Sequence, residues 1–203
     1  MRVLRAANYR AAPWKNSLGT TREILRYPPG AADFVYRLSL ADVTESCDFS
    51  AFPGYDRIIT LIDGDGFELQ FADGRTHALT TPHVPFRFDG GAPVSCAVAG
   101  GPSRDLNLMV RRDAAKVESG ILTVVGRLVL PPVPGATRLI VVLTEAITAR
   151  SGGQTAELGR WDTACMDATG APADETICTS AGSALLFHAI VMPRAGQDLG
   201  RGR

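Results

Sequence analysis

The feature that most constrains the fold is a succession of short β-rich runs, interrupted along the whole chain by Gly, Pro, Asp and Asn. Such a succession is typical of a β-sandwich or a β-barrel. No segment has the periodicity of a long amphipathic helix, and only residues 113–118 are expected to form a short helical turn. The sequence therefore predicts an all-β protein with strands at Phe34–Ala41, Arg57–Ile62, Gly66–Phe71, Asp105–Arg111, Gly120–Leu130, Arg138–Thr144, Glu157–Cys165 and Ser183–Met192.

A tight turn is predicted between Ile62 and Gly66. Its Asp-Gly-Asp sequence supplies residues that readily adopt a positive φ. We therefore expect the strands before and after it to form a β-hairpin.

The two halves of the chain share a pattern. RIITLIDGDGFELQ starts at Arg57 and RLIVVLTEAITAR starts at Arg138, 81 positions later. DLNLMVRR starts at Asp105, and ALLFHAIVMPR places Leu185 opposite it, 80 positions later. Two landmarks with nearly equal offsets indicate a duplicated β unit. We predict a first half at 1–112 and a degenerate second half at 113–203, packed as one body across a short Pro-rich stretch.

Charge and hydropathy exclude several classes of partner. The chain has 21 basic and 21 acidic residues, so no overall charge favours nucleic acid or an anionic membrane. The N-terminus has no signal-peptide apolar region, and the longest apolar run, Leu139–Leu143, is too short to span a bilayer. We expect a cytoplasmic protein with four reduced cysteines.

The sequence lacks the residues that a metal site or a common cofactor site requires. The three histidines, His77, His83 and His188, are scattered, whereas a mononuclear metal site needs three or four convergent ligands. No nucleophile elbow, Walker loop or dinucleotide fingerprint is present. We therefore expect no metal, no cofactor and no catalytic nucleophile. A catalytic base, if there is one, would be Glu23, Asp56, Asp105 or His83.

Two strands carry polar side chains on one face and apolar side chains on the other. Arg37 and Ser39 share a face in FVYRLSLA, and Asp105, Asn107, Met109 and Arg111 share a face in DLNLMVR. A solvent-facing surface is one interpretation. Met109 and Asn107 fit it poorly, and a guanidinium suits a carboxylate ligand, so the alternative is the wall of a ligand pocket.

Two further segments have the composition of loops at a barrel mouth. WKNSLGTTREI (14–24) combines an indole, a turn at Asn16–Gly19 and a strand that places Arg22 and Glu23 on opposite faces. FSAFPGYDR (49–57) places two aromatic residues and a Pro-Gly turn before Asp56 and Arg57.

Four motifs, in the order and spacing in which they stand along the chain, resemble the HutD/Ves family of bicupin proteins: WKNSLGTTREI, FVYRLSLADV, FSAFPGYDRIITLIDGDGFEL and DLNLMVRR. The resemblance is strong over residues 1–112 and extends beyond them only in length and β character. It implies two cupin-like antiparallel β-barrels, or jelly rolls, without the metal-binding histidines of other cupins. The family usually has a run of glycines after the asparagine of the first motif, where this chain has Ser17-Leu18-Gly19.

The resemblance also implies a function: binding of a small carboxylate such as formylglutamate, with a regulatory role in histidine utilisation. The motif positions carried over include Thr21, Phe49, Ser50, Pro53, Gly54 and Asp105. The predicted ligand-binding residues are Trp14, Asn16, Arg22, Glu23, Arg37, Ser39, Phe52, Asp56, Arg57, Asn107, Met109 and Arg111.

Three functions stay open on the sequence. The leading one is non-catalytic binding of a small carboxylate. The second is a metal-free isomerase or epimerase that acts on a small acidic metabolite, with Glu23 or Asp56 as base; it requires a carboxylate of raised pKa in the cavity. The third is a structural module in which apolar strands of the second half form a homodimer.

Overall fold

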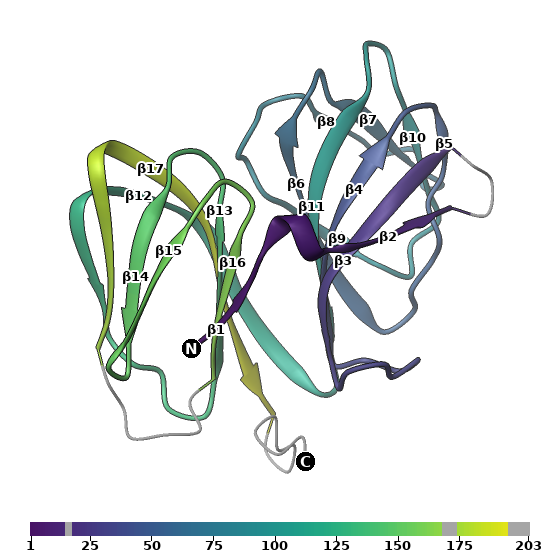
Figure 1. Ribbon diagram of the computed structural model, residues 1–203. Helices are drawn as coiled ribbons and strands as arrows, with labels where there is room; N and C mark the ends of the chain where they lie inside the picture. The colour runs from purple at the N-terminus through teal and green to yellow at the C-terminus, as the bar shows by residue number, and fades with distance from the viewer. Residues whose placement is uncertain (15–17, 168–173, 195–203) are drawn as a thin grey trace. The chain divides into compact units, whose positions relative to one another are not determined.

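The computed structural model describes residues 1–14, 18–167 and 174–194 (Figure 1). The chain divides into two compact units, here called the N-terminal unit (Arg10–Asp113) and the C-terminal unit (Met1–Tyr9 with the chain from Ala114 onward). The first nine residues, which the sequence placed in the first half at 1–112, thus group with the C-terminal unit. The reason is β1 (Arg2–Leu4), which pairs antiparallel with a strand of the C-terminal unit.

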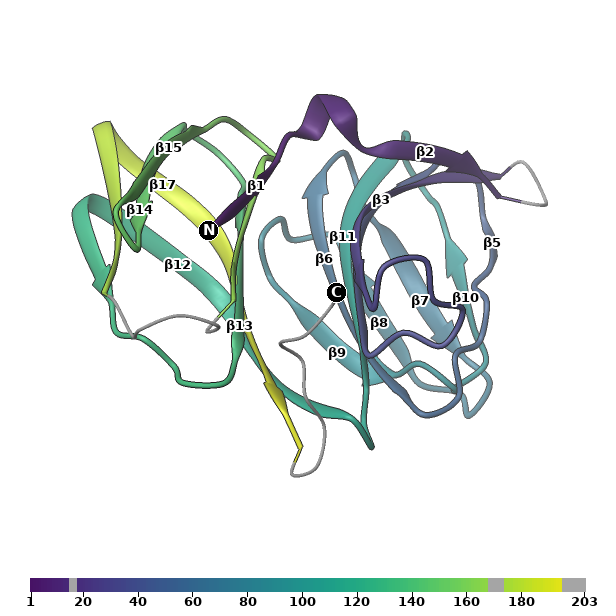
Figure 2. The same cartoon turned by 60° about the horizontal axis from the view of Figure 1, so that its bottom comes forward.

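The N-terminal unit is built from two antiparallel sheets (Figure 2). The six-stranded sheet has the order β2-β3-β4-β11-β6-β9, and the four-stranded sheet has the order β5-β10-β7-β8. The strands are β2 (Arg10–Pro13), β3 (Gly19–Tyr27), β4 (Tyr36–Val43), β5 (Cys47–Asp48), β6 (Tyr55–Asp63), β7 (Phe67–Phe71), β8 (Thr76–Leu79), β9 (Phe86–Asp89), β10 (Val94–Ala97) and β11 (Ser103–Arg111).

The core of the N-terminal unit lies between these sheets. Val43, Ile59 and Leu61 of the six-stranded sheet pack with Phe67 and Leu69 of the four-stranded sheet. Alternate residues of a strand point to opposite faces, so the inward set of each strand is apolar in this part of the unit. The apolar core holds the two sheets together and leaves the polar inward residues to line a cavity elsewhere between them.

The C-terminal unit is one seven-stranded sheet with the order β1-β16-β13-β17-β14-β15, in which β12 also pairs with β17. Its core gathers buried apolar side chains of β12, β13, β14, β16 and β17. A short 3-10 helix, η1 (Ala6–Asn8), follows β1. The remaining strands are β12 (Ala115–Leu130), β13 (Thr137–Val142), β14 (Ile147–Ser151), β15 (Gln154–Leu158), β16 (Thr163–Asp167) and β17 (Glu175–Pro193).

The duplicated β unit is visible in the strand register. In the N-terminal unit Arg57 of β6 pairs with Met109 of β11, and in the C-terminal unit Arg138 of β13 pairs with Ile190 of β17. Both residues of the second pair stand 81 positions after those of the first. The pairing of β4 with β11 and of β12 with β17 keeps the same offset, because Ser39 pairs with Asn107 and Gly120 with His188. Three adjacent strands thus repeat at one offset.

Three local predictions are wrong. β6 and β7 pair in different sheets, so the turn between them, with Gly64 and Gly66 at positive φ, connects the two sheets instead of closing a hairpin. Residues from Ala115 onward belong to β12 because this segment pairs with β17, so no helical turn forms there. The strand expected over 157–165 is divided between β15 and β16, which are separated by a turn around Trp161.

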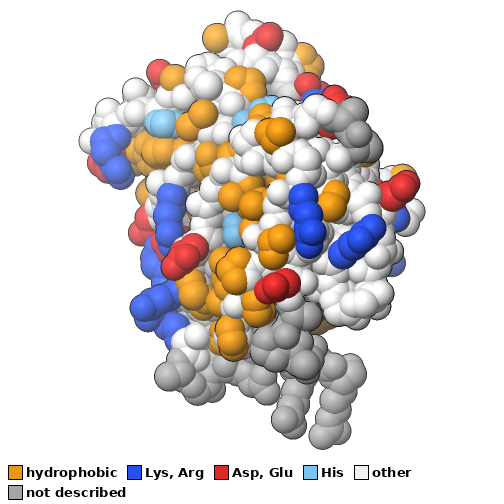
Figure 3. Space-filling model, turned by 90° about the vertical axis from the view of Figure 1, so that its left-hand side faces the viewer, with side chains coloured by type: hydrophobic (Ala, Val, Ile, Leu, Met, Phe, Trp, Pro, Cys, Tyr) orange, Lys and Arg blue, Asp and Glu red, His pale blue; other side chains and the backbone are white. Residues whose placement is uncertain are grey.

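Two strongly exposed valines, Val125 and Val129, lie on β12. Figure 3 shows one face of the molecule, where hydrophobic side chains lie between charged ones. All four cysteines are free thiols. No helix formed by the described residues is long and apolar enough to cross a membrane.

Candidate functional site: an arginine-lined cavity in the N-terminal unit

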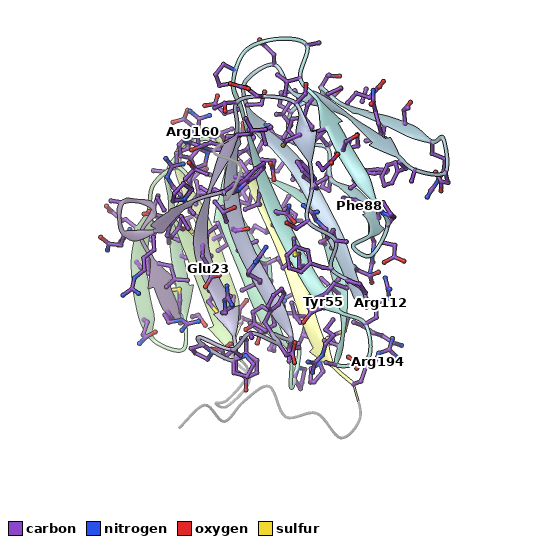
Figure 4. All side chains as sticks on the ribbon, turned by 90° about the vertical axis from the view of Figure 1, so that its right-hand side faces the viewer. Glu23, Tyr55, Phe88, Arg112, Arg160 and Arg194 are labelled. Atoms are coloured by element: carbon purple, nitrogen blue, oxygen red, sulfur yellow. The ribbon has the colours of Figure 1, made fainter. Side chains whose placement is uncertain are left out.

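A cavity of about 500 Å³ opens within the N-terminal unit. Its wall is the inward face of the six-stranded sheet, whose edge regions are marked in Figure 4 by Glu23 on β3 and Phe88 on β9. The lining follows from strand register, since partners across an antiparallel sheet face the same side. Three cross-strand rows line the cavity: Arg37, Met109 and Arg57; Glu23, Ser39 and Asn107; and Thr21, Ala41 and Asp105.

A β-bulge in β3 changes which residues face the cavity. The register between β3 and β4 shifts between Glu23 and Leu25, so both Glu23 and Arg26 line the cavity although three positions separate them. The Arg26 Nε donates to both carboxylate oxygens of Glu23 at 2.9 Å, and its Nη1 donates to the Ala31 carbonyl at 2.8 Å. Glu23 and Arg26 therefore neutralise one another.

Arg37 has no carboxylate partner among the described residues. Its guanidinium lies over the rings of Phe34 and Phe52, 5.2 and 5.1 Å from their centroids, and its Nη2 donates to the Met109 Sδ at 3.5 Å. Its buried Nε has no hydrogen-bond partner. Burial, and then the positive charge of Arg26, lower the pKa of Arg37. This side chain therefore presents an uncompensated positive charge to the cavity.

Arg57 is more deeply buried, with 5% of its surface exposed. The rings of Phe49 and Phe88 lie 5.1 Å from its guanidinium, and its Nε has no hydrogen-bond partner. Burial lowers the pKa of Arg57 to about 10, while the negative charge of Asp105 raises it. The aromatic rings hold the guanidinium by cation–π attraction but satisfy none of its N–H groups.

Asp105 and Asn107 supply acceptors on the same wall. Asp105 is 1% exposed, and the Oδ1 atoms of both residues have no hydrogen-bond partner. Burial raises the pKa of Asp105 to about 7, against the lowering effects of Arg57 and of the Asn107 side chain. Unsatisfied buried polar atoms are rare in proteins, and their concentration on one cavity wall marks a place where a ligand would complete the bonding.

The loop residue Trp14 also lines the cavity. Its indole Nε1 donates to the Thr21 hydroxyl at 2.7 Å, and its ring meets Phe49 edge-on at 6.0 Å. A Cβ at Gly19 would lie 2.7 Å from the Asp42 carbonyl and 2.8 Å from the Trp14 ring. Glycine at 19 thus allows the indole to approach the start of β3.

The structure brings eight predicted residues together at the cavity: Trp14, Glu23, Arg37, Ser39, Phe52, Arg57, Asn107 and Met109. Three others are outside its lining because other groups hold them. Arg22 forms an ion pair with Asp42 on the opposite face of β3, and Asp56 pairs with Arg87 at 2.6 Å and with Arg112 at 3.2 Å. Arg111 pairs with Asp113 at 3.0 Å. Asn16 lies outside the described residues.

Asp105 and Arg26 line the cavity but are not among the residues predicted to bind a ligand. Asp105 was detectable, since it shares a strand face with Asn107 and Met109. Arg26 was not, because a bulge has no signal in strand alternation.

A cupin-type metal does not fit this cavity. Four arginines and three acidic residues line it, and none of the lining residues among those that the structure describes is a histidine. Among residues 1–14, 18–167 and 174–194, no three His, Cys, Asp or Glu side chains converge as a metal-binding group.

The sequence profile of HutD matches residues 6–186. The chain belongs to the HutD family. It is 46% identical over 110 residues to an uncharacterised 21.2 kDa protein in the hutC 3′ region of Pseudomonas putida, and 42% identical over 106 residues to protein Ves of Citrobacter koseri. These matches cover 54% and 52% of the chain and 57% and 55% of the relatives, so the chain spans about half the length of the curated relatives it matches.

Solved structures agree with the HutD assignment. HutD from Pseudomonas fluorescens SBW25 (formate condition) matches with a TM-score of 0.79 and 32% identity, covering 96% of this chain and 99% of that one. A cupin 2 conserved barrel domain protein from Leptotrichia buccalis has a TM-score of 0.63 at 11% identity, covering 94% and 96% of the two chains. The second likeness shows the cupin fold alone.

Proposed function

We propose that this HutD-family protein binds a small carboxylate, without catalysis, in the cavity of its N-terminal unit. The observation that carries the proposal is the pair Arg37 and Arg57, a half-buried and a buried guanidinium group with no carboxylate partner among the described residues. A buried charge is costly unless it is paired. A guanidinium matches a carboxylate in charge and in its forked geometry.

The unsatisfied atoms restrict the ligand further. The Nε atoms of Arg37 and Arg57 need acceptors, and the Oδ1 atoms of Asp105 and Asn107 need donors. A ligand with carboxylates and an N–H group supplies both kinds. Formylglutamate, with two carboxylates and one amide N–H, meets these demands. The hutC-region name of the P. putida relative supports a regulatory role in histidine utilisation.

Calorimetric titration with N-formylglutamate and glutarate tests the binding function. A charge-assisted hydrogen bond contributes about 1.5–3 kcal/mol, so Arg37→Ala should weaken binding about ten- to a hundred-fold. Asn107→Ala should weaken N-formylglutamate more than glutarate, which has no N–H donor. Arg22→Ala is the matched control, because Arg22 pairs with Asp42 and not with the cavity. Failure of both acids to bind at millimolar concentration contradicts the proposal.

One observation favours a metal-free enzyme as the second candidate. Asp105 is a buried carboxyl group on the cavity wall whose pKa is raised to about 7, near the value that suits a general base. Asp105 is one of the four candidate bases named from the sequence, but the isomerase or epimerase hypothesis used Glu23 or Asp56 instead. Proton exchange at the carbon next to the ligand carboxylate, followed by NMR in heavy water, separates the candidates. Tight binding without exchange favours the non-catalytic function.

The third function, a homodimeric module, draws less support. An apolar, filled barrel would favour it, whereas this cavity is open and contains arginines. The exposed Val125 and Val129 of β12 are the side chains to replace if sedimentation shows a dimer.

A further inference from the structure

We propose that the cavity takes up one proton together with a dicarboxylate ligand, and that Asp105 holds this proton in the complex. The inference rests on the carboxylate-binding function proposed above and adds the way in which pH regulates it. It makes the protein a receptor whose affinity for dicarboxylates depends on proton concentration near neutrality.

The geometry places one carboxyl group where it competes with the ligand for a guanidinium. Asp105 and Arg57 line the same cavity from adjacent strands, and each interacts with the charge of the other. No ion pair joins them, and the Asp105 Oδ1 and the Arg57 Nε are both buried without a hydrogen-bond partner. A ligand carboxylate bound to Arg57 would therefore stand close to Asp105. Two carboxylates that share one site do not both ionise, so one of them holds a proton.

The charges of the cavity favour the same outcome. Arg26 is neutralised by Glu23, which leaves Arg37 and Arg57 as the deep positive charges. With Asp105 ionised, the deep wall has a net charge of about +1. With Asp105 neutral, this charge is about +2 and matches a dicarboxylate.

The groups packed around Asp105 come from each neighbouring strand. Arg57 of β6 favours the carboxylate form, whereas Asp42 of β4 opposes it. Asp42 itself stays ionised, because its hydrogen bonds to Arg104 and Arg22 lower its pKa. Asn107 of β11 favours the carboxylate, and Cys96 of β10 senses the charge of Asp105 but is a neutral thiol whose pKa is raised by burial. Together with burial, these groups place the titration of Asp105 near neutral pH, where a proton is easily gained.

In the C-terminal unit, the arginine at the position equivalent to Arg57 pairs with one carboxylate of the protein itself. There Arg138 forms an ion pair with Glu175, and the residue at the position of Asp105, 81 places later, is Leu186. One carboxylate neutralises the charge of Arg138, although the Arg138 Nε has no hydrogen-bond partner, and no second carboxyl group stands on that wall position. In the N-terminal unit the ligand takes the role of Glu175, so Asp105 is the second carboxyl group and must lose its charge.

The test is calorimetry of the intact protein with glutarate and N-formylglutamate at pH 6 and pH 8, each in two buffers of different ionisation enthalpy. The buffer dependence of the heat gives the number of protons taken up. We expect about one proton per ligand at pH 8, fewer at pH 6, and an affinity that is about tenfold lower at pH 8. Asp105→Asn should bind with the same affinity at both pH values and without proton uptake. Asp56→Asn, outside the cavity, is the control and should keep the uptake.

The outcomes separate this inference from the binding function. Binding without proton uptake at pH 8 overturns the inference and leaves the function intact. Undiminished uptake in Asp105→Asn assigns the proton to another group and also overturns it. Absence of binding at every pH overturns both. If Asp105→Asn unfolds, Asp105→Leu, which installs the residue of the equivalent C-terminal position, serves instead, and the wild-type measurement needs no variant.

Discussion

Arg57 in the N-terminal unit and Arg138 in the C-terminal unit occupy the same position of a duplicated fold, yet their surroundings differ. Each is 5% exposed and pairs with the equivalent residue of the neighbouring strand. Arg138 donates to the Glu175 carboxylate and, at 2.7 Å, to the Pro131 carbonyl. Arg57 has aromatic rings against its guanidinium and forms no ion pair with any residue that the structure describes. The C-terminal unit thus pairs its arginine with its own carboxylate, whereas the arginine of the N-terminal unit faces the cavity.

The two units differ in the source of the carboxylate that pairs with this arginine. Both units keep the strands, the register and the buried arginine, since these belong to the shared fold. The carboxylate that completes the charge pair is internal in the C-terminal unit. We infer that in the N-terminal unit the ligand supplies it.

The largest expected effect is on stability and separates the two arginines. Arg138→Met leaves Glu175 buried without its partner and should lower the free energy of unfolding by about 3–5 kcal/mol. Arg57→Met at pH 6 should change it by less than about 1 kcal/mol, because no carboxylate loses an ion pair. Urea unfolding of both variants checks this. Equal losses would show that Arg57 has a structural partner and would end the contrast.

The second prediction concerns pH, which should act on the two units with opposite sign. The pKa of Asp105 is raised to about 7, so the folded protein binds more protons than the unfolded chain between about pH 4 and 7. The contribution of Asp105 to stability should therefore fall as pH rises through this window, by roughly 4 kcal/mol at most. Asp105→Asn should remove this slope and be more stable than the wild type at pH 8.

His188 of β17 is the opposing group. Burial, and then the positive charge of Arg138, lower its pKa to about 4, so the unfolded chain binds more protons between pH 4 and 6.5. Stability through this residue should fall as pH drops across that range. This range overlaps the range in which Asp105 titrates, so the two contributions oppose one another in the wild type. His188→Gln should therefore make stability fall more steeply as pH rises from 4 to 6.5 and leave its pH dependence above pH 7 unchanged, which urea unfolding across the range measures. A pH dependence like that of the wild type would contradict the assignment.

The smallest expected effect is the binding of an added anion to Arg138 after its carboxylate partner has been removed. Glu175→Ala removes the internal carboxylate and should destabilise the protein, and added acetate should restore part of the loss by pairing with Arg138. At ten times its dissociation constant, a bound anion contributes about 1.4 kcal/mol. Thermal unfolding in acetate against chloride at equal ionic strength measures it. No specific effect of acetate would mean that the C-terminal wall collapses instead of accepting an anion.

Much of the cavity was predictable because strand alternation is a local property. The polar faces of β4 and β11 were placed correctly, and so was the opposition of Arg22 and Glu23 in β3. The wrong predictions concern charged residues whose position depends on the ion-pair partner that they find in the fold. Arg22, Asp56 and Arg111 were expected at the cavity, but carboxylates and guanidinium groups from other segments hold two of them, and Asp113 holds the third.

The all-β class, the duplication and the residues that face inward on each strand could be predicted from the sequence. Hydrophobic alternation and repeated motifs are local properties of the chain and do not depend on which segments come together in the fold. The HutD resemblance carried the identity of the motifs. Which arginines form ion pairs and which face the cavity without one follows from contacts in the folded protein. That outcome depends on the bulge in β3, the strand register and the approach of segments such as Glu175 to Arg138. These contacts join residues far apart in the chain, and charge pairing in a buried site is set by their relative positions in space.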